Sequence, residues 1–504
     1  MAQNVTTVDL QAKAEALAKE GVVGITITWA DNNGITRSRT VPVDQLAAVA
    51  ERGVGVTTLF AVFDSHDGIT FGHPGLSTPS GDIRLIPVSD RIVQLAGQPA
   101  FAWVPGRQVA ADGSAWPYDQ RGALERQVAR AAELGLEFRA GYEMEFHLSH
   151  AEPGPGGSTQ LALPGPAYGP RVLLDVDGFA AQLLGDLRDN GVRVNQFHAE
   201  YGPAQFELSI AAADPVTAAD QQLLARQTIH AAARAHGLRA SFAPLVTGAG
   251  VGNGWHLHTS LSRDGVNLLS GGEGPYGLTA EGAAYLAGLL RDLPAITAVT
   301  APSVPSLHRL RPGYFSSAYT FWGVENREAA LRFVPATELL GASHANVELK
   351  PSDASANPHL ALAVVIASGL AGIADGLTPP EPIQENPDTW SAERREAENI
   401  RRLPTHPRRT ARGPARQRPC PRRPRRGTPG RLRRRPRGRP GLGRGQTPRR
   451  HHHRPPVALL TPLSKNASRT GSGVFPVFGK VVQLRVIGGA ESGVCVDRRG
   501  ECRS

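Results

Sequence analysis

The stretch NQFHAEYGPAQFELS, residues 195–209, holds two carboxylates, Glu200 and Glu207, with aromatic and aliphatic residues between them. Gly202-Pro203 separates the two acids, and a glycine followed by a proline marks a tight reversal of the chain. We therefore predict two adjoining strand ends that turn Glu200 and Glu207 into one space. Paired carboxylates in an apolar setting are costly unless a cation neutralises them. The alternative interpretation is a surface loop with two unrelated acids, so this stretch by itself only nominates a metal site.

Three further stretches place polar side chains at alternate positions between apolar neighbours. Because side chains two positions apart lie on one face of a strand, each stretch predicts a strand with one polar face. One such face is usually just solvated. Four of them turned toward one another would hold more than one hard cation, and oxygen-rich ligand sets suit Mg²⁺ or Mn²⁺. The residues are Glu143 and Glu145 in AGYEMEFHL, His256 and His258 in GNGWHLHTSL, and Asn346, Glu348 and Lys350 in ANVELK.

The charge of the chain divides near residue 400. Residues 1–400 carry 27 Lys+Arg against 42 Asp+Glu, whereas residues 401–504 carry 28 against 3. The mildly acidic body does not indicate nucleic-acid binding and fits an enzyme that collects cations. The body has no cysteine, which excludes a disulfide framework or Cys-ligated zinc there. The chain's three cysteines all lie in the tail, at Cys420, Cys495 and Cys502.

Targeting and membrane signals are weak. No uninterrupted apolar segment follows a basic start at the N-terminus, so we expect no secretory signal and a cytoplasmic protein. The most apolar run is LALAVVIASGLAGIA, residues 360–374. It is shorter than the roughly 18 to 20 residues that span a bilayer and predicts a buried helix instead.

Turn and periodicity signals predict an α+β fold in which strands supply the site and helices cover the other face of the sheet. Short β-rich pieces fill the first part of the chain to about Pro105: VVGITITWAD, TRSRTVPV, VTTLFAVFD, DIRLIPV and FAWVPG. No G-x-G-x-x-G or G-x-x-x-x-G-K-[ST] loop is present, so we expect neither a Rossmann nor a P-loop nucleotide site. Helices are predicted at 8–20, 118–135 and 280–292. Three more are predicted to begin at N-cap residues: Asp177, for a helix through Arg188; Asp214, followed by Pro215, for one ending at His236-Gly237; and Asn357, followed by Pro358, for the apolar helix.

From about residue 403 the chain changes character. The segment RRLPTHPRRTARGPARQRPCPRRPRRGTPGRLRRRPRGRPGLGRG, residues 401–445, has no acid and almost no aliphatic residue. Such a segment cannot bury enough apolar area to offset its ordering entropy, so we expect it to be disordered. One interpretation is an Arg-rich arm for nucleic acid. The interpretation that composition favours is the out-of-frame translation of a G+C-rich gene, which resequencing around codon 403 would test.

Six motifs follow one another in the body: EMEF, EYGPAQFE, NGWHLHTS, RLRPGY, ENREAALR and NVELKPSDASANP. In content and order they resemble the glutamine synthetase superfamily, over roughly residues 15–400. The resemblance implies a small N-terminal β-grasp-like domain at 1–110, a catalytic domain with a curved antiparallel sheet at 111–402, and a separate tail at 403–504. It also implies ATP and L-glutamate as substrates, two or more Mg²⁺ or Mn²⁺ ions per site, and a homo-oligomeric ring. The ring implied by the family is a dodecamer, which C-terminal helices help to assemble. In this sequence those helices are absent or scrambled.

The resemblance also implies roles for individual residues, carried over position by position. Arg327 and Asp64 are implied as catalytic, with Asp64 completing the amine site of a neighbouring subunit. The implied metal ligands are Glu145, Glu200 and Glu207 for one ion, and Glu143, His256 and Glu348 for the second. The implied substrate ligands are His258, Ser260, Arg327 and Arg332 for the ATP phosphates, and Gly252, Arg309 and Lys350 for glutamate.

The departures from the family's pattern concern the amine. Glutamine synthetases have a glutamate directly after P-G-Y that binds ammonium and takes its proton, and here that position is Phe315. An aromatic ring cannot accept a proton, but it can wall an apolar pocket for an amine that bears carbon. Lys350 and Asn346 stand where the family has arginines, and Val251 where it has an asparagine.

With these departures, the sequence resembles the branch of the family that comprises γ-glutamyl-amine ligases acting on polyamines or ethanolamine. We expect a ligase that joins L-glutamate to a small primary amine through γ-glutamyl phosphate, since metals and arginines can neutralise the two anions that must meet. Ethanolamine is favoured over polyamines, because no carboxylate cluster is obvious beyond Asp64 and Asp67, which equally suit a turn. Two alternatives stay open: an ammonia-using glutamine synthetase, and a catalytically silent homologue impaired by its altered C-terminus.

Overall fold

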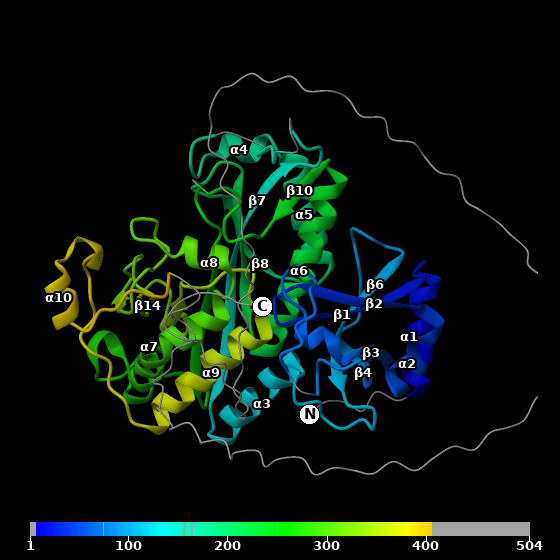
Figure 1. The fold of residues 1–504 in the computed structure, drawn as a ribbon, viewed down its shortest axis with the longest axis horizontal. Coiled ribbons are helices and arrows are strands. Elements are labelled where there is room, and N and C mark those ends of the chain that lie inside the picture. Colours follow the sequence, from blue (N-terminus) through cyan, green and yellow to red (C-terminus); the bar gives the residue numbers. More distant parts are fainter. Residues whose placement is uncertain (1–6, 74, 155–157, 163–164, 249, 406–504) are drawn as a thin grey trace, which may run out of the picture. The chain divides into compact units, whose positions relative to one another are not determined.

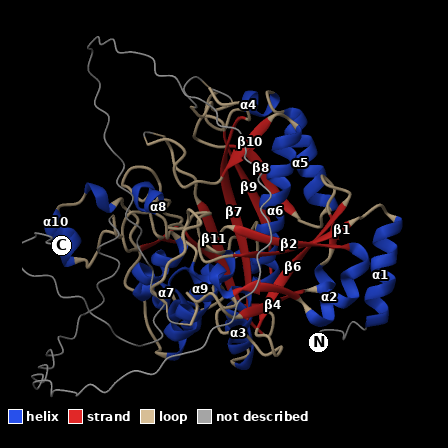
Figure 2. Ribbon diagram, turned by 45° about the vertical axis from the view of Figure 1, so that its right-hand side comes forward, coloured by secondary structure: helices blue, strands red, loops and turns tan. Residues whose placement is uncertain are grey.

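The computed structural model describes residues 7–405 apart from 74, 155–157, 163–164 and 249. Helices and strands are mixed along this part of the chain, so the α+β prediction is confirmed (Figure 2). The predictions made for the tail from residue 406 onward, including its disorder and its possible binding of nucleic acid, lie outside the described residues.

A first sheet is built from the N-terminal strands, in the order β2-β1-β6-β4-β3, with β5 paired to β6. It packs with α1 and α2 around its own apolar core (Figure 1). Residues 58–62, expected to continue a strand, instead form a 3₁₀ turn, because the Thr57 hydroxyl accepts a hydrogen bond from the Leu59 amide and bends the chain. The elements are α1 (Thr7–Lys19), β1 (Gly24–Ala30), β2 (Thr36–Pro42), α2 (Leu46–Arg52), β3 (Val54–Thr57), β4 (Asp82–Pro87), β5 (Val93–Gln94) and β6 (Phe101–Val109).

A second, larger sheet follows, in the order β13-β14-β15-β11-β7-β9-β8, with β10 paired to β7 and β12 to β11. Its long central strand alternates Tyr142, Met144 and Phe146, which lie in the main apolar core, with the acids Glu143 and Glu145. The strands are β7 (Glu137–His150), β8 (Val194–Ala199), β9 (Gln205–Ala213), β10 (Leu238–Ser241), β11 (Trp255–Arg263), β12 (Val266–Asn267), β13 (Trp322–Val324), β14 (Leu331–Val334) and β15 (Asn346–Leu349).

Helices cover the apolar side of this sheet and share its core. Two predicted N-caps are confirmed: the Asp214 side chain accepts from the Thr217 amide, and that of Asn357 from the Leu360 amide, both at 3.0 Å. The helices after the first sheet are α3 (Gln120–Glu133), α4 (Pro170–Leu174), α5 (Asp177–Asp189), α6 (Pro215–Ala235), α7 (Ala280–Thr300), α8 (Val304–Arg309), α9 (Pro358–Ala374) and α10 (Ala392–Ala397). Of these, α10 has no buried residue and takes no part in this core.

Two helix predictions need correction. Asp177 is the first residue of α5 and not its cap, since Val176 holds the cap position. The helix predicted at 280–292 continues through Pro294 to Thr300 as α7. Helix α7 packs closely along α9, since a Cβ added to Gly288 would lie only 2.4 Å from a backbone oxygen of α9. This packing holds α7 in place.

The apolar run at 360–374 is a buried helix, α9, as predicted. In the described part of the chain, no helix combines the length and the apolar character needed to cross a membrane.

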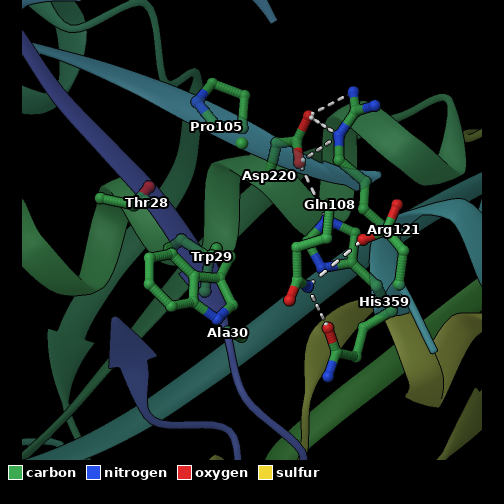
Figure 3. Close-up of a pocket in the computed structure, with 12 residues that line it drawn as sticks. Thr28, Trp29, Ala30, Pro105, Gln108, Arg121, Asp220 and His359 are labelled. Atoms are coloured by element: carbon green, nitrogen blue, oxygen red, sulfur yellow. Dashed lines mark hydrogen bonds and ion pairs between the residues drawn. The ribbon is translucent and has the colours of Figure 1, made fainter. Parts of the chain in front are cut away.

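A small cavity lies where β1 and β6 meet α3, α6 and α9, and buried charges line it (Figure 3). Asp220 on α6 accepts hydrogen bonds from Arg121 on α3, at 2.9 Å, and from His359 on α9, at 2.8 Å. Hydrogen bonds from His359 and the charge of Arg121 keep the pKa of Asp220 below its usual value, although burial alone would raise it. This cluster ties three helices together and lies apart from the polar face of the second sheet, so we assign it a structural role.

Candidate active site

Neighbouring strands of the second sheet carry the predicted ligands on one face, in the order β15, β11, β7 and β9. The side chains of directly opposed residues on adjacent strands lie close together. The strand register therefore decides which predicted ligands meet. The opposed pairs are His258 with Glu348, His256 with Glu143, and Glu145 with Glu207.

One group of three candidate ligands is centred on His256. Its Nδ1 lies 3.3 Å from a carboxylate oxygen of Glu143 and 3.4 Å from one of Glu348. Donor atoms of all three residues lie within 4.8 Å of one another. These are the three residues that the family resemblance implies as ligands of one metal ion.

A second group surrounds Glu207. Its donor atoms lie within 4.8 Å of those of Glu145 and His256 on one side, and of His198 and Glu200 on the other. The strand ends around Gly202-Pro203 do turn both glutamates into one space. His198, 3.4 Å from Glu207, was missed by the sequence reasoning. A usable signal existed, since His198 lies two positions before Glu200.

The charges in this cluster are not balanced by basic side chains alone. Burial raises the pKa of Glu145, and the neighbouring Glu207 raises it further. Burial likewise raises the pKa of Glu207, against a hydrogen bond from His198. Both carboxylates are therefore costly to ionise unless a cation lies beside them.

Two of the remaining acids, Glu348 and Glu143, have compensating partners. Burial would raise the pKa of Glu348, but the charge of Lys350, followed by those of the two histidines, lowers it to about 2. Lys350 Nζ lies 3.3 Å from Glu348, and Arg332 contacts the other carboxylate oxygen at 3.0 Å. Hydrogen bonds from His256 and His258 hold the pKa of Glu143 well below its ordinary value, although burial opposes this shift.

Small and amide residues shape the cluster. Gly254 donates its amide to Glu145 at 2.9 Å, and a Cβ here would lie 2.5 Å from His256 Nε2. Gln205 donates to Glu145 at 2.8 Å and to the Gly252 carbonyl at 3.0 Å. The carboxylate of Glu145 is thus oriented by groups that leave its other oxygen free to bind a cation.

Arg309, at the end of α8, lies against Gly252. A Cβ on Gly252 would come within 2.4 Å of the Arg309 side chain, so the glycine permits the close approach. The guanidinium donates to the Ser352 carbonyl at 2.7 Å, while its buried Nε has no partner among the described residues. A buried donor without a partner suits a substrate carboxylate.

Other predicted residues are not joined to the cluster by side-chain contacts between described residues. Ser260 lies on β11, and Arg327 is exposed between β13 and β14. The Phe315 side chain is 61% exposed. Asp64 caps its own turn, accepting from the amides of His66 and Gly68 at 2.8 Å each.

The fold and the cluster define an α+β protein whose larger sheet carries five carboxylates and two histidines that could hold divalent cations. The donor set fits such ions, since it is oxygen-rich and largely buried, and Gly254 leaves space beside it.

Comparison with known proteins identifies the family. The sequence model of the glutamine synthetase catalytic domain matches residues 117–412. The chain therefore belongs to the glutamine synthetase family and is a ligase of that family, a family that uses ATP and divalent metals.

Relatives and solved structures agree with this assignment. The gamma-glutamylpolyamine synthetase of Streptomyces coelicolor is 46% identical over 389 residues, which is 77% of this chain and 83% of the relative. The glutamine synthetase of Pyrococcus horikoshii is 31% identical, over 75% of this chain and 81% of its own. A crystal structure of a novel glutamine synthase homolog has a TM-score of 0.67 at 32% identity, covering 76% of this chain and 86% of that one. A GmaS complex with ADP has a TM-score of 0.66 at 27% identity, covering 78% and 87%.

Proposed function

We propose that this chain is an ATP-dependent ligase that forms a γ-glutamyl amide from L-glutamate and a primary amine, through γ-glutamyl phosphate. One observation carries the proposal: a full set of metal-binding side chains accompanies Phe315, at a position where an ammonia-using enzyme needs a carboxylate. The similarity to a gamma-glutamylpolyamine synthetase supports the same conclusion.

In this proposal the acidic cluster holds at least two Mg²⁺ or Mn²⁺ ions. Bound there, the ions neutralise the charge of the ATP phosphates as the γ-phosphoryl group moves. The side chains of the cluster fix the positions of these charges, and His198 orients Glu207. The proposed ligands are Glu143, Glu145, Glu200, Glu207, His256 and Glu348.

The surrounding residues bind the two anionic substrates. We assign the ATP phosphates to His258, Ser260, Arg327 and Arg332, because a guanidinium donates two parallel hydrogen bonds to a phosphate. Arg309, Gly252 and Lys350 receive glutamate, with the buried Arg309 Nε available to its carboxylate. We also propose that Asp64 acts as a catalytic residue in the active site of a neighbouring subunit of a ring. For this role its carboxylate must leave the hydrogen bonds that it accepts within its own turn.

The amine is assigned to the polyamine class first and to ethanolamine second. The sequence favoured ethanolamine because no further carboxylate was obvious. The similarity to a gamma-glutamylpolyamine synthetase now supports the polyamine class over ethanolamine.

The test is an amine panel with the purified full chain, ATP, Mg²⁺ and L-glutamate. Putrescine, spermidine, ethanolamine, methylamine and ammonia would each be supplied, with phosphate release and the mass of the product measured. Formation of a γ-glutamyl amide with one amine class supports the proposal. Preference for ammonia over every amine would make the chain a glutamine synthetase, and no product with any of them would make it a silent homologue.

A further inference from the structure

Glu328 is an acid that none of the assigned roles uses. It lies between β13 and β14, directly after Arg327, and only 9% of its surface is exposed. One carboxylate oxygen accepts a hydrogen bond from the Phe315 amide at 3.3 Å. Its other oxygen has no hydrogen-bond partner among the residues that the structure describes. Glu328 thus presents an open acceptor beside the residue that departs from the family's pattern.

The charged groups around Glu328 are already engaged with other residues. Lys350 lies within electrostatic reach, but its Nζ contacts Glu348 at 3.3 Å. Asp388 is the other charge that acts on Glu328, and it accepts a hydrogen bond from the Tyr319 hydroxyl at 2.8 Å. Burial raises the pKa of Glu328, and the hydrogen bond from the Phe315 amide, followed by the charge of Lys350, offsets only part of this effect. Within the described residues Glu328 forms no salt bridge, so a cation bound at its open oxygen would stabilise the ionised carboxylate.

A primary alkylamine supplies such a cation. Amines of this type have pKa values near that of lysine, about 10.4, and are therefore protonated in neutral water. The nitrogen can attack an acyl phosphate only after it has lost one proton, so the site needs a group that binds an ammonium and then accepts a proton. The Phe315 ring can do neither, whereas a buried carboxylate with a raised pKa suits both tasks.

We infer that Glu328 binds the ammonium group of the amine substrate and accepts its proton before the nitrogen attacks γ-glutamyl phosphate. The proton moves from nitrogen to the carboxylate, and the freed electron pair forms the C–N bond to the γ-carbonyl carbon. The bond from that carbon to the phosphate oxygen breaks, and phosphate leaves with the electron pair and takes the second proton of the nitrogen. This inference rests on the proposed function and names the residue that takes the place of the missing acid at position 315.

The test compares Glu328→Gln with the wild type, using two nucleophiles. Alkylamines must be bound as cations and deprotonated, whereas hydroxylamine is largely uncharged at neutral pH and needs neither step. We expect kcat/KM for the alkylamine to fall by about 10²- to 10⁴-fold. Formation of γ-glutamyl hydroxamate from hydroxylamine should change by less than about tenfold, and Glu328→Asp should recover part of the alkylamine activity. Glu396→Gln, the same change at an exposed position on α10, is the control and should leave both reactions unchanged.

The outcomes separate this inference from the proposed function. If the wild type forms no γ-glutamyl amide with any amine, the proposed function fails. If it does and Glu328→Gln keeps full alkylamine activity, only the inference about Glu328 fails. Equal losses with alkylamine and hydroxylamine would mean that Glu328 serves the fold or the phosphoryl transfer, and would likewise overturn the inference.

Discussion

Replacing Gly254 by alanine tests the geometry of the acidic cluster most directly. The added Cβ would lie 2.5 Å from His256 Nε2 and 2.9 Å from a carboxylate oxygen of Glu145. Ordinary contacts begin near 3.4 Å, so the imidazole must retreat by roughly 1 Å. The φ angle of Gly254 is not in the left-handed region, so the effect comes from the side-chain contact and not from backbone strain.

This displacement should weaken metal binding more than it destabilises the fold. Disturbing the groups that orient metal ligands typically costs about 10- to 100-fold in affinity. Overpacking costs about 1–3 kcal/mol of unfolding free energy, which a chain of this size can tolerate. We therefore expect Gly254→Ala to remain folded and to bind Mn²⁺ about 10- to 100-fold more weakly.

The assay is calorimetric titration of the metal-free full chain with Mn²⁺, together with urea unfolding in the presence of a chelator. Gly185→Ala is the matched control, because Gly185 lies in α5 with nothing within 4 Å of its added Cβ. Alanine there should leave metal binding unchanged and stabilise the helix by about 0.8–1 kcal/mol. Wild-type Mn²⁺ affinity in Gly254→Ala would refute the assignment of His256 and Glu145 as ligands.

Two further changes test other parts of the structure. Asp220→Asn should lower the unfolding free energy by about 3–5 kcal/mol, because it leaves the buried Arg121 guanidinium without its main partner, and urea unfolding with a loss below about 1 kcal/mol would contradict this. The folded-state pKa of Asp220 lies below the ordinary value of 3.8. The stabilisation by the ionised Asp220 carboxylate is therefore fully present above pH 3.8 and is lost as the pH falls through the folded-state pKa. The difference in unfolding free energy between wild type and Asp220→Asn should accordingly shrink in acid. Phe315→Glu should raise ammonia-dependent phosphate release by restoring a carboxylate at the amine position, and unchanged ammonia activity would show that position 315 does not select the nucleophile.

The polar faces of the site strands could be predicted because they depend only on a period of two. Glu143 and Glu145, and His256 and His258, had to share a face on any strand, and the apolar residues between them had to enter a core. The caps at Asp214 and Asn357 were equally local, since a short polar side chain and a following proline define a helix start within a few residues. The family followed from the order of such motifs.

Long-range pairing decided the rest. The register between strands set His198 beside Glu207, and packing of the loop after α8 against the β13–β14 turn brought Glu328 to the amide of Phe315. The period of two could have marked His198 as a candidate residue, but neither contact could be predicted, because the partners are separated along the chain and only the folded structure fixes their distance. The continuation of α7 through Pro294 has the same cause, since close packing on α9 outweighs a local helix-breaking tendency. The sequence by itself thus determined which side chains were available to hold metal and substrates, and the tertiary structure decided which of them meet.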